Sequence, residues 1–363
     1  MSILLKPFDC MSVPKLIYKL ELFGIAGNVL SCIRSFLTGR IQRVKVGEVF
    51  SSYRSVLSGV PQGSVLGPIL FTLYINDIVD CFLPDTRVKL YADDLKSYSR
   101  ITGPQSIDLF RSVLNPLTVW ASDWQLPISV GKSCWMRVSN RKDAEHIGFV
   151  LGGGDLQLSE DLKDLGVTFT SKLNFSIHIS SVIKKAKQRI FLLNKCFLSK
   201  DILTLVRAFK TYVLPILDYC SQVWSPSHIT DITRLESVQR VFTKGLFKCV
   251  TMSYPERLVK AGLCTLELRR LRADLVFCYK ILHRLILINI DDLFVLDHLA
   301  VTRGHCWKLR AVKPRLDSRL HFYAYRTVRV WNTLAEATVC SPSIITFKSC
   351  LNKEDLSAFL IMK

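Results

Sequence analysis

The chain has 363 residues, and its composition excludes a globally disordered protein. It is 49% hydrophobic and 22% charged, which is enough apolar material for a buried core. At roughly 100–200 residues per domain, the length suggests two or three domains. No apolar run approaches the roughly 18 residues of a membrane-spanning helix. The continuous apolar segment before Lys6 is only three residues long, too short for a signal peptide. We therefore expect an intracellular protein, in the cytoplasm or the nucleus, without membrane contact.

The charge is strongly positive. Lys and Arg number 49 against 30 Asp and Glu, a net charge of +19, yet residues 1–100 hold only 12 of the basic and 8 of the acidic side chains. An excess of this size favours a polyanionic partner, and nucleic acid is the most common one. A basic surface that only maintains solubility would account for the charge alone about as well.

The 12 cysteines are scattered, with no CxxC spacing. Without an export signal they indicate reduced, mostly buried thiols rather than a disulfide scaffold. His305-Cys306 is the single His–Cys neighbour pair, and no further candidate ligand follows two to four residues away. We therefore do not expect structural zinc.

The hydrophobic spacing of the first hundred residues predicts helices followed by strands. Two helices are expected within residues 12–37, then a β-hairpin over 41–57 with Gly47 at its turn. A loop rich in Gly and Pro over 58–63 precedes an expected apolar helix over 64–79. Its inward residues would be Leu66, Ile69, Leu70, Leu73 and Ile78. Strands are expected over 87–91 and through Tyr98, with a tight acidic turn at Asp93-Asp94 between them.

Beyond residue 100 the pattern becomes mainly helical. One amphipathic helix is expected over 105–124, with inward residues Leu109, Val113, Leu117, Trp120 and Trp124. Short strands should follow near 135–138, 147–151 and 165–169, and residues 152–154 form a glycine turn that lacks the following helix of a phosphate loop. Residues 175–288 should be helical, and a mixed basic segment follows from about residue 300.

Asp93 and Asp94 are two adjacent carboxylates at a strand-turn-strand corner. Their charges repel each other, so the arrangement makes most sense where a divalent cation neutralises them, and Mg²⁺ prefers such hard oxygen ligands. On turn chemistry alone, an ordinary Asp-Asp turn is the more frequent explanation.

The neighbouring sequence favours the cation site over an ordinary turn. Residues 58–68 read SGVPQGSVLGP, residues 71–77 read FTLYIND, and residues 91–94 read YADD. Together these blocks resemble the reverse transcriptases of non-LTR retrotransposons of the jockey and chicken-repeat type. Blocks at 218–224, 235–240, 269–275 and 330–334 resemble the thumb and carboxyl-terminal region of the same elements.

The resemblance implies an α+β fold with a reverse-transcriptase palm, in which helices pack on an antiparallel sheet, followed by a mainly helical thumb and carboxyl-terminal region. The palm would span residues 1–150, without the fingers and the start of the first palm motif. The primer-grip hairpin, which Leu165-Gly166-Val167 resembles, and the helical thumb would span 151–290, and a basic carboxyl-terminal region 291–363.

The resemblance also implies roles for individual residues. Asp93 and Asp94 would be catalytic carboxylates that bind the metal, and Lys132 would act near the leaving pyrophosphate, although a solvated loop lysine explains it equally well. Phe8 would screen the ribose 2′ position of the incoming nucleotide. Template and nucleotide would pack on Gly59, Pro61, Gln62 and Gly63, where small residues let a strand approach the backbone.

The first palm motif departs from the family pattern. The family has a metal-binding Asp five residues before the aromatic residue, and here that position is Ile3. Asp9 would not replace it, because six residues of extended strand displace it by on the order of 20 Å, and Pro7 would remove a strand hydrogen bond. We therefore expect an amino-terminally truncated or decayed copy with negligible polymerase activity.

The leading hypothesis is an RNA-directed DNA polymerase that uses Mg²⁺, an RNA template, a DNA primer and deoxynucleoside triphosphates. The alternatives are a non-catalytic nucleic-acid-binding remnant and a functionless fragment. For binding, we expect a basic face from residue 175 onward, which includes Lys184, Lys185, Lys187, Arg189, Arg269, Arg270 and Arg272. Arg269 and Arg272 could instead pair with Glu267 and Asp274 and hold helices together.

Overall fold

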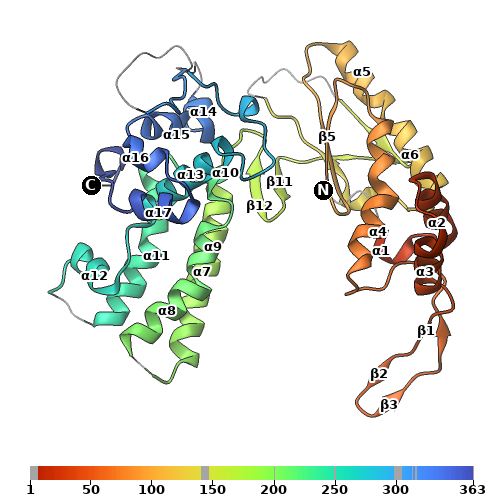
Figure 1. Ribbon diagram of the computed structural model, residues 1–363, viewed down its shortest axis with the longest axis horizontal. Coiled ribbons are helices and arrows are strands. Elements are labelled where there is room, and N and C mark those ends of the chain that lie inside the picture. The colour runs from red at the N-terminus through yellow and green to blue at the C-terminus, as the bar shows by residue number, and fades with distance from the viewer. Residues whose placement is uncertain are drawn as a thin grey trace. The chain divides into compact units, whose positions relative to one another are not determined.

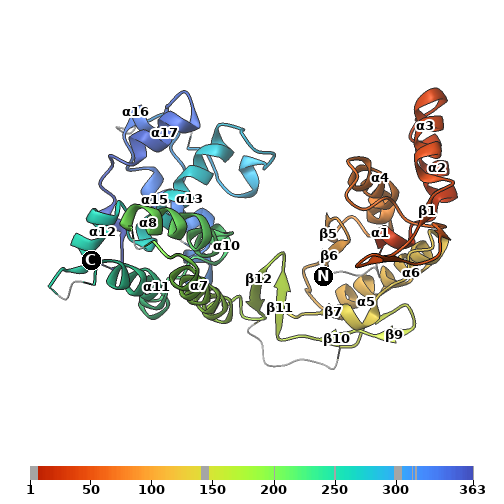
Figure 2. The same ribbon diagram turned by 90° about the horizontal axis from the view of Figure 1, so that it is seen from below.

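The computed structural model describes residues 7–139, 147–199, 201–248, 251–297, 305–312, 314 and 317–362. The chain divides into two compact units, Met1–Asp164 and Leu165–Lys363, whose ribbons are drawn in Figures 1 and 2. The predicted boundaries at residues 150 and 290, between palm, thumb and carboxyl-terminal region, stay a prediction. Within the described parts of the chain, every helix is too short or too polar to cross a membrane.

The amino-terminal unit combines short helices with two-stranded sheets. Its helices are α1 (Pro7–Cys10), α2 (Val13–Leu22), α3 (Gly27–Leu37), α4 (Leu66–Ile75), α5 (Pro104–Ser112) and α6 (Leu114–Asp123), with 3-10 turns η1 (Asn76–Cys81) and η2 (Val130–Lys132). Its strands are β1 (Ile41–Gln42), β2 (Lys45–Val46), β3 (Val49–Phe50), β4 (Arg54–Ser55), β5 (Arg87–Tyr91), β6 (Asp94–Tyr98), β7 (Cys134–Trp135), β8 (Val150–Leu151), β9 (Gly154–Asp155), β10 (Gln157–Leu158) and β11 (Asp161–Asp164).

The sheets of this unit are small and mostly antiparallel. β1 pairs with β4, β2 with β3, β5 with β6 and β8 with β9 in antiparallel register, whereas β7 and β10 run parallel. The expected hairpin over 41–57 is present, and its four short strands are fully exposed. Figure 1 shows the β2–β3 end of this hairpin extending beyond the helices of its own unit. The α+β prediction is confirmed.

The apolar helix begins and ends inside its expected range. The α-helix covers Leu66–Ile75 and continues as the 3-10 turn Asn76–Cys81. Leu70 and Ile78 are buried as predicted, but Leu66 and Ile69 are exposed, and Phe71, Tyr74 and Ile75 fill the core instead. The helix is apolar around most of its circumference, so its sequence pattern could not identify the face that packs against α2.

The segment 105–124 forms two helices rather than one. α5 ends at Ser112 and α6 begins at Leu114, with Val113 between them. Pro116 lies in the first turn of α6, where its missing N–H costs little, whereas it would interrupt a continuous helix. The predicted inward residue Leu109 is 57% exposed, and Ile107 is buried in its place.

A buried lysine lies in the core of the amino-terminal unit. Lys19 on α2 is 2% exposed; its Nζ is 2.5 Å from Asp77 Oδ1, donates to the Tyr74 carbonyl and lies 3.6 Å from the centre of the Trp124 ring. Burial lowers the pKa of Lys19, while Asp77 acts in the opposite direction. The ion pair ties α2 to η1 and completes the packing of α4.

The carboxyl-terminal unit is almost entirely helical. It begins with β12 (Val167–Thr170), and its helices are α7 (Ser176–Cys196), α8 (Ile202–Tyr212), α9 (Leu214–Asp218), α10 (Ser221–Trp224), α11 (Ile229–Phe247), α12 (Tyr254–Ala261), α13 (Leu266–Leu282), α14 (Asp317–Leu320), α15 (Tyr323–Trp331), α16 (Glu336–Val339) and α17 (Ile344–Leu351). The 3-10 turns η3 (Ile290–Asp292) and η4 (Ser357–Phe359) complete it. Long helices α7 and α11 lie side by side (Figure 1).

Two apolar clusters form the core of this unit. One joins α7, α8, α9 and α11, and the other packs α15, α16 and α17 against the carboxyl-terminal half of α13. Glu236 on α11 holds α12 and the start of α13 beside the first cluster, because its buried carboxylate accepts hydrogen bonds from Tyr254 Oη and, at 2.9 Å, from the Leu266 amide. Burial raises the pKa of Glu236.

Candidate functional site

The acidic turn lies at the tip of the β5–β6 hairpin. Leu90 pairs with Leu95 and Tyr91 with Asp94, so Ala92 and Asp93 form the two-residue connection. Ala92 has a φ of 50°, the left-handed conformation that tight hairpin turns require. Leu95 is buried at 3% exposure, and strand alternation places Asp94 on the opposite face. The expected hairpin is confirmed, but its turn lies one residue earlier than predicted, at Ala92-Asp93, and Asp94 is the first residue of β6. Asp93 and Asp94 are both half-buried.

The loop over 58–63 is bound to the amino-terminal helix. Gly59 donates its amide to the Met11 carbonyl at 2.8 Å, and Val60 donates to the Phe8 carbonyl at 3.0 Å. Two side chains of the loop meet Asp9: Ser58 Oγ donates to its carbonyl and Gln62 Nε2 to its Oδ1, each at 2.8 Å. The structure therefore brings four of the predicted site residues, Phe8, Gly59, Pro61 and Gln62, into one hydrogen-bonded segment.

Glycine is required at position 59, where the loop approaches the backbone of Phe8 and Asp9 most closely. Its φ is +82°, and a Cβ there would lie 2.7 Å from the Phe8 carbonyl oxygen and 2.8 Å from that of Asp9. Both contacts are shorter than any side chain tolerates, so the loop packs on this backbone only through glycine. Gly63, also left-handed at φ +79°, has nothing within 4 Å of the equivalent position, which leaves open space beside the exposed Gln62.

Phe8 connects the loop to α4. Its ring stacks on Phe71 with centroids 4.0 Å apart and an interplanar angle of 28°, and it is half-buried against the core. The segment Pro7–Cys10 is one turn of helix rather than a strand. Pro7 at its first position therefore costs no strand hydrogen bond, and the expected extended-strand displacement of Asp9 does not apply to this turn. Ile3 lies outside the described residues.

The rest of the glycine-rich block builds the start of α4. Ser64 Oγ donates to the Pro61 carbonyl at 2.6 Å and accepts from the Gly67 amide at 3.0 Å. A Cβ on Gly67 would lie 2.9 Å from Ser64 Oγ and 3.2 Å from the Pro61 carbonyl. The block thus combines a loop that leaves Gln62 exposed with a helix start that fixes the position of the loop.

Lys132 and the hairpin lysines differ in their surroundings. Lys132 is exposed on η2, and neither it nor Asp94 takes part in the hydrogen bonds of the 58–63 loop within the described residues. Lys96 on β6 pairs with Asp164 on β11 at 2.5 Å, a contact that sequence reasoning missed. No local signal marks this pair, because 68 residues separate its members. The pair attaches the acidic hairpin to the end of β11.

The described carboxylates do not by themselves fit a two-metal centre. Such a centre needs carboxylates from more than one element to hold its ions roughly 4 Å apart. Within the described residues, no group of three or more His, Cys, Asp or Glu side chains could hold a metal ion, and the turn contributes only Asp93 and Asp94. The donor set is therefore incomplete, and no catalytic step through bound metal follows from it.

Comparison with known proteins identifies the amino-terminal unit. Residues 4–169 match the family model described as reverse transcriptase (RNA-dependent DNA polymerase). The matched range includes the acidic turn, the glycine-rich loop and Phe8. Over residues 4–169 the chain is therefore similar to reverse transcriptases. Reverse transcriptases generally use divalent metal ions.

The relatives are proteins of mobile elements. The chain is 28% identical to the RNA-directed DNA polymerase from mobile element jockey of Drosophila funebris over 243 residues, 64% of this chain and 26% of that protein. It is 28% identical to the Drosophila melanogaster jockey protein over 246 residues, 63% of the chain and 26% of the relative. It is also 27% identical to the probable RNA-directed DNA polymerase from transposon BS of Drosophila melanogaster, over 60% of the chain and 25% of that protein. The matches thus span about a quarter of the length of these relatives.

The jockey-like blocks of the carboxyl-terminal unit mainly support its fold. Trp224 is fully buried and donates to the Tyr219 carbonyl at 2.7 Å. Asp274 pairs with Arg326 at 2.9 Å, and Asn332 exchanges two hydrogen bonds with the backbone of Leu309. These contacts join segments that lie 5 to 52 residues apart. Much of the resemblance in this unit is therefore explained by packing.

The expected pairing of the α13 arginines was wrong in its partners. Arg269 pairs with Asp218 at 2.7 Å, and Arg272 donates to the Asn352 carbonyl at 3.2 Å, whereas Glu267 accepts the amides of Ile361 and Met362. Arg270 is 3% exposed and so does not belong to a basic face. Each of these partners is distant in sequence, which a helix-spacing argument cannot detect.

Proposed function

We propose that this chain is the palm and thumb part of an RNA-directed DNA polymerase. The observation that carries the proposal is the combination of the acidic β5–β6 turn with the 58–63 loop in one reverse transcriptase domain. In this proposal the substrates are an RNA template, a DNA primer and deoxynucleoside triphosphates. Such a function belongs inside the cell, in the cytoplasm or the nucleus.

The proposed roles follow from what each side chain presents. Asp93 and Asp94 present two half-buried carboxylates at a hairpin tip, where a divalent cation, Mg²⁺ in this proposal, would be bound. Gln62 and Gly63 form the exposed end of the loop and would contact template and nucleotide, while Gly59 packs on the backbone of α1 and Pro61 accepts a hydrogen bond from Ser64. Phe8, fixed on Phe71, would screen the ribose. Lys132 would act at the leaving pyrophosphate.

The same residues lead us to propose that polymerisation by this chain is negligible. Family catalysis places the metal between carboxylates of two motifs, and the first-motif position is occupied by Ile3, whose side chain has no oxygen ligand. Asp9, the nearest carboxylate of the α1 turn, already accepts a hydrogen bond from Gln62. The chain would therefore bind substrates without stabilising the developing charge of phosphoryl transfer.

Primer extension tests this proposal. The full chain is incubated with primed RNA, deoxynucleoside triphosphates and Mg²⁺, and compared with Ile3→Asp and with Ile3→Asp combined with Asp93→Asn. We expect no extension by the natural chain, extension by Ile3→Asp, and its loss in the double variant, because both carboxylates are then needed. Robust extension by the natural chain would contradict its inactivity, and extension that survives Asp93→Asn would contradict the site.

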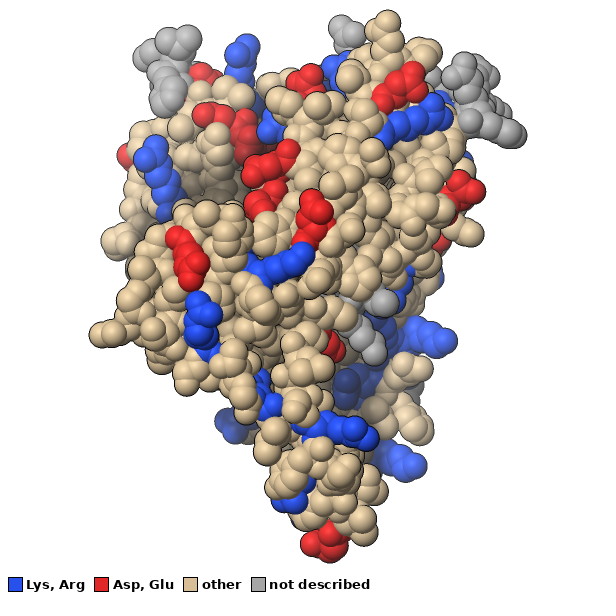
Figure 3. Space-filling view, turned by 90° about the vertical axis from the view of Figure 1, so that its right-hand side faces the viewer, with Lys and Arg blue, Asp and Glu red and all other residues tan. Residues whose placement is uncertain are grey.

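A second candidate, a non-catalytic nucleic-acid-binding protein, is favoured by the surface of α7. Lys184, Lys185, Lys187 and Arg189 are all exposed, while Ala186 between them and Ile190 after them are buried. By contrast, the face drawn in Figure 3 carries Lys and Arg side chains that stand apart, with Asp, Glu and uncharged side chains between them. α7 would thus contact the phosphate backbone without reading sequence.

Salt-dependent binding separates this candidate from a functionless fragment. Binding of a primer–template duplex to the full chain should weaken steeply with salt, by roughly 0.9 in the log–log slope per phosphate contacted. Replacing Lys184, Lys185 and Lys187 with Ala should flatten the slope. An unchanged slope and affinity would leave α7 without a binding role.

A further inference from the structure

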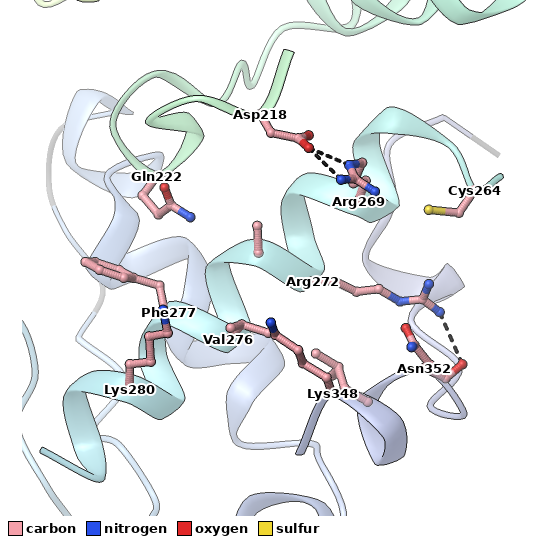
Figure 4. A pocket seen from close by; sticks show the side chains of 12 residues that line it. Asp218, Gln222, Cys264, Arg269, Arg272, Val276, Phe277, Lys280, Lys348 and Asn352 are labelled. Carbon is pink, nitrogen blue, oxygen red and sulfur yellow. Dashed lines mark hydrogen bonds and ion pairs between the residues drawn. The ribbon is translucent and has the colours of Figure 1, made fainter. Parts of the chain in front are cut away.

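A pocket in the carboxyl-terminal unit lies along one face of α13. It has a volume of about 410 Å³ and is lined by α13, by Asp218 on α9 and Gln222 on α10, and by the end of α17. Figure 4 shows the side chains that line it, with Lys348 on α17 extending toward Val276 on α13. The pocket belongs to neither the acidic turn nor the 58–63 loop, which are parts of the other unit.

The pocket carries an excess of positive charge. Its lining contains four cations and a single carboxylate, Asp218. Asp218 is 2.7 Å from Arg269, so these two charges cancel. Three cations then remain, Arg272, Lys280 and Lys348, and within the described residues none of the three has a carboxylate partner. A ligand with two or three negative charges would therefore complement this pocket.

The Arg272 guanidinium is only partly satisfied. Its Nη2 donates to the Asn352 carbonyl at 3.2 Å, whereas its Nε is buried and has no hydrogen-bond acceptor among the described residues. An arginine has five N–H donors in a fixed planar arrangement that matches phosphate and carboxylate oxygens. Burial raises the pKa of the neighbouring Cys264 thiol, whereas the positive charges of Arg272 and Arg269 lower it. An anion in the pocket would meet the exposed Nη end of this guanidinium rather than its buried Nε.

The spacing of the cations indicates a ligand that carries more than one anionic group. Arg272 and Lys280 lie eight residues apart on α13, a separation of about 12 Å along the helix axis at 1.5 Å per residue. Val276, Phe277 and Leu351 provide an apolar surface between the charges. An apolar surface flanked by separated cations is suited to a base or sugar linked to several phosphates.

We propose that this pocket binds the phosphate groups of a nucleotide, with Lys280 and Lys348 at its entrance and Arg272 at its inner wall. The choice of a nucleotide over other polyanions rests on the proposed function, which brings nucleotides to this protein. The pocket would recognise a phosphate group that is linked to a nucleoside. Two ligands carry such a group: a free deoxynucleoside triphosphate and a nucleotide within a single-stranded nucleic acid.

Binding titrations of the full chain test the proposal without requiring polymerisation. The probes are dATP, a twelve-nucleotide RNA strand and inorganic phosphate, each titrated by calorimetry in the absence of a primer. The test variant is Lys280→Ala combined with Lys348→Ala, whose side chains reach solvent and are therefore dispensable for folding. The matched control is Lys210→Ala combined with Lys244→Ala, which removes the same charge from exposed positions on α8 and α11.

We expect the test variant to weaken binding of at least one nucleotide probe roughly tenfold, as removal of two charge-assisted contacts implies, while the control variant changes it less than twofold. Loss for dATP identifies the free nucleotide as the source, and loss for RNA alone identifies a strand, with a salt slope reduced by about 1.4 for two phosphates. Equal effects of the two variants, or no effect of the test variant on either probe, would overturn the proposal. The pocket substitutions leave Asp93 and Asp94 unchanged, so the titrations report on the pocket, whereas the primer-extension series reports on the polymerase assignment, and the failure of either proposal is recognised separately.

Discussion

The contact between Gly59 and the α1 backbone allows a quantitative test of the loop geometry. In Gly59→Ala, the new Cβ would lie 2.7, 2.8 and 2.9 Å from three backbone atoms of Phe8 and Asp9. The left-handed φ of +82° adds roughly 1–2 kcal/mol for a non-glycine residue, and overpacking adds about 1–3 kcal/mol. We expect unfolding of the amino-terminal unit to become easier by about 3 kcal/mol, after a small gain from the lower entropy of the unfolded chain.

Gly63→Ala is the matched control for this substitution. Gly63 has nearly the same φ, +79°, but a Cβ there meets nothing within 4 Å. This variant therefore carries the conformational strain without the clash, and its cost should be only about 1 kcal/mol. The difference between the two variants, about 2 kcal/mol, isolates the close approach of the loop to α1.

Hydrogen exchange followed by mass spectrometry measures the effect in each unit separately. In Gly59→Ala, exchange of the amides in 7–22 and 58–67 should accelerate roughly 100-fold, since about 1.4 kcal/mol corresponds to a factor of ten. Peptides of the carboxyl-terminal unit serve as the internal reference. Equal protection in Gly59→Ala and Gly63→Ala would refute the reasoning, because it would mean that the loop does not rest on the backbone of Phe8 and Asp9.

Three further predictions concern ionisable groups. Burial raises the pKa of Glu236 above 4.5, so at pH values just above 4.5 the folded state retains a proton that the unfolded state loses. The free energy of unfolding therefore falls as pH rises through this range. In urea denaturation at a series of pH values, Glu236→Gln should make the free energy of unfolding less dependent on pH there. Burial lowers the pKa of Lys19 below 10.5, so the unfolded chain binds more protons at pH values just below 10.5. The stability contributed by this group rises with pH there, and Lys19→Met should lack that rise. Cys306 and Cys340, whose sulfur atoms are 3.9 Å apart, should form a disulfide with the thiol oxidant diamide, seen as a loss of two mass units in the peptide pair, and Cys340→Ser should prevent it. Exposed Cys196 provides the comparison, since it should remain a thiol at the same diamide concentration.

The elements that sequence predicted best are those set by local chemistry. The β5–β6 hairpin was predictable because alternating apolar residues frame two aspartates that favour a turn. The exposed hairpin over 41–57 was predictable from its alternation and from Gly47, which has a φ of +59°. In both cases the turn residue and the strand period agree, so a short window of sequence contains the information that specifies the structure.

The features that sequence missed depend on contacts between distant residues. The outward orientation of Ile69 and Leu109 is decided by which neighbours α4 and α5 meet, and an apolar helix gives little indication of that choice. The partners of Arg269 and Arg272 lie 51 and 80 residues away. The cation pocket on α13 was therefore hidden, although two of its members were recognised as basic residues.

The candidate site shows the same division. Its residues were recognisable from the glycine-rich and acidic blocks, yet the α1 turn and the contact of Gln62 with Asp9 were not, because 53 residues separate that pair. This contact shows that the Asp9 carboxylate of the first palm motif binds the 58–63 loop. Ser58 Oγ donates to the Asp9 carbonyl, and the amides of Gly59 and Val60 donate to the Met11 and Phe8 carbonyls, so the loop is attached to the segment that carries Asp9, whose carboxylate accepts from Gln62. Any substitution of Asp9 would remove this loop contact, so Ile3→Asp is the more direct test of the proposed first-motif carboxylate.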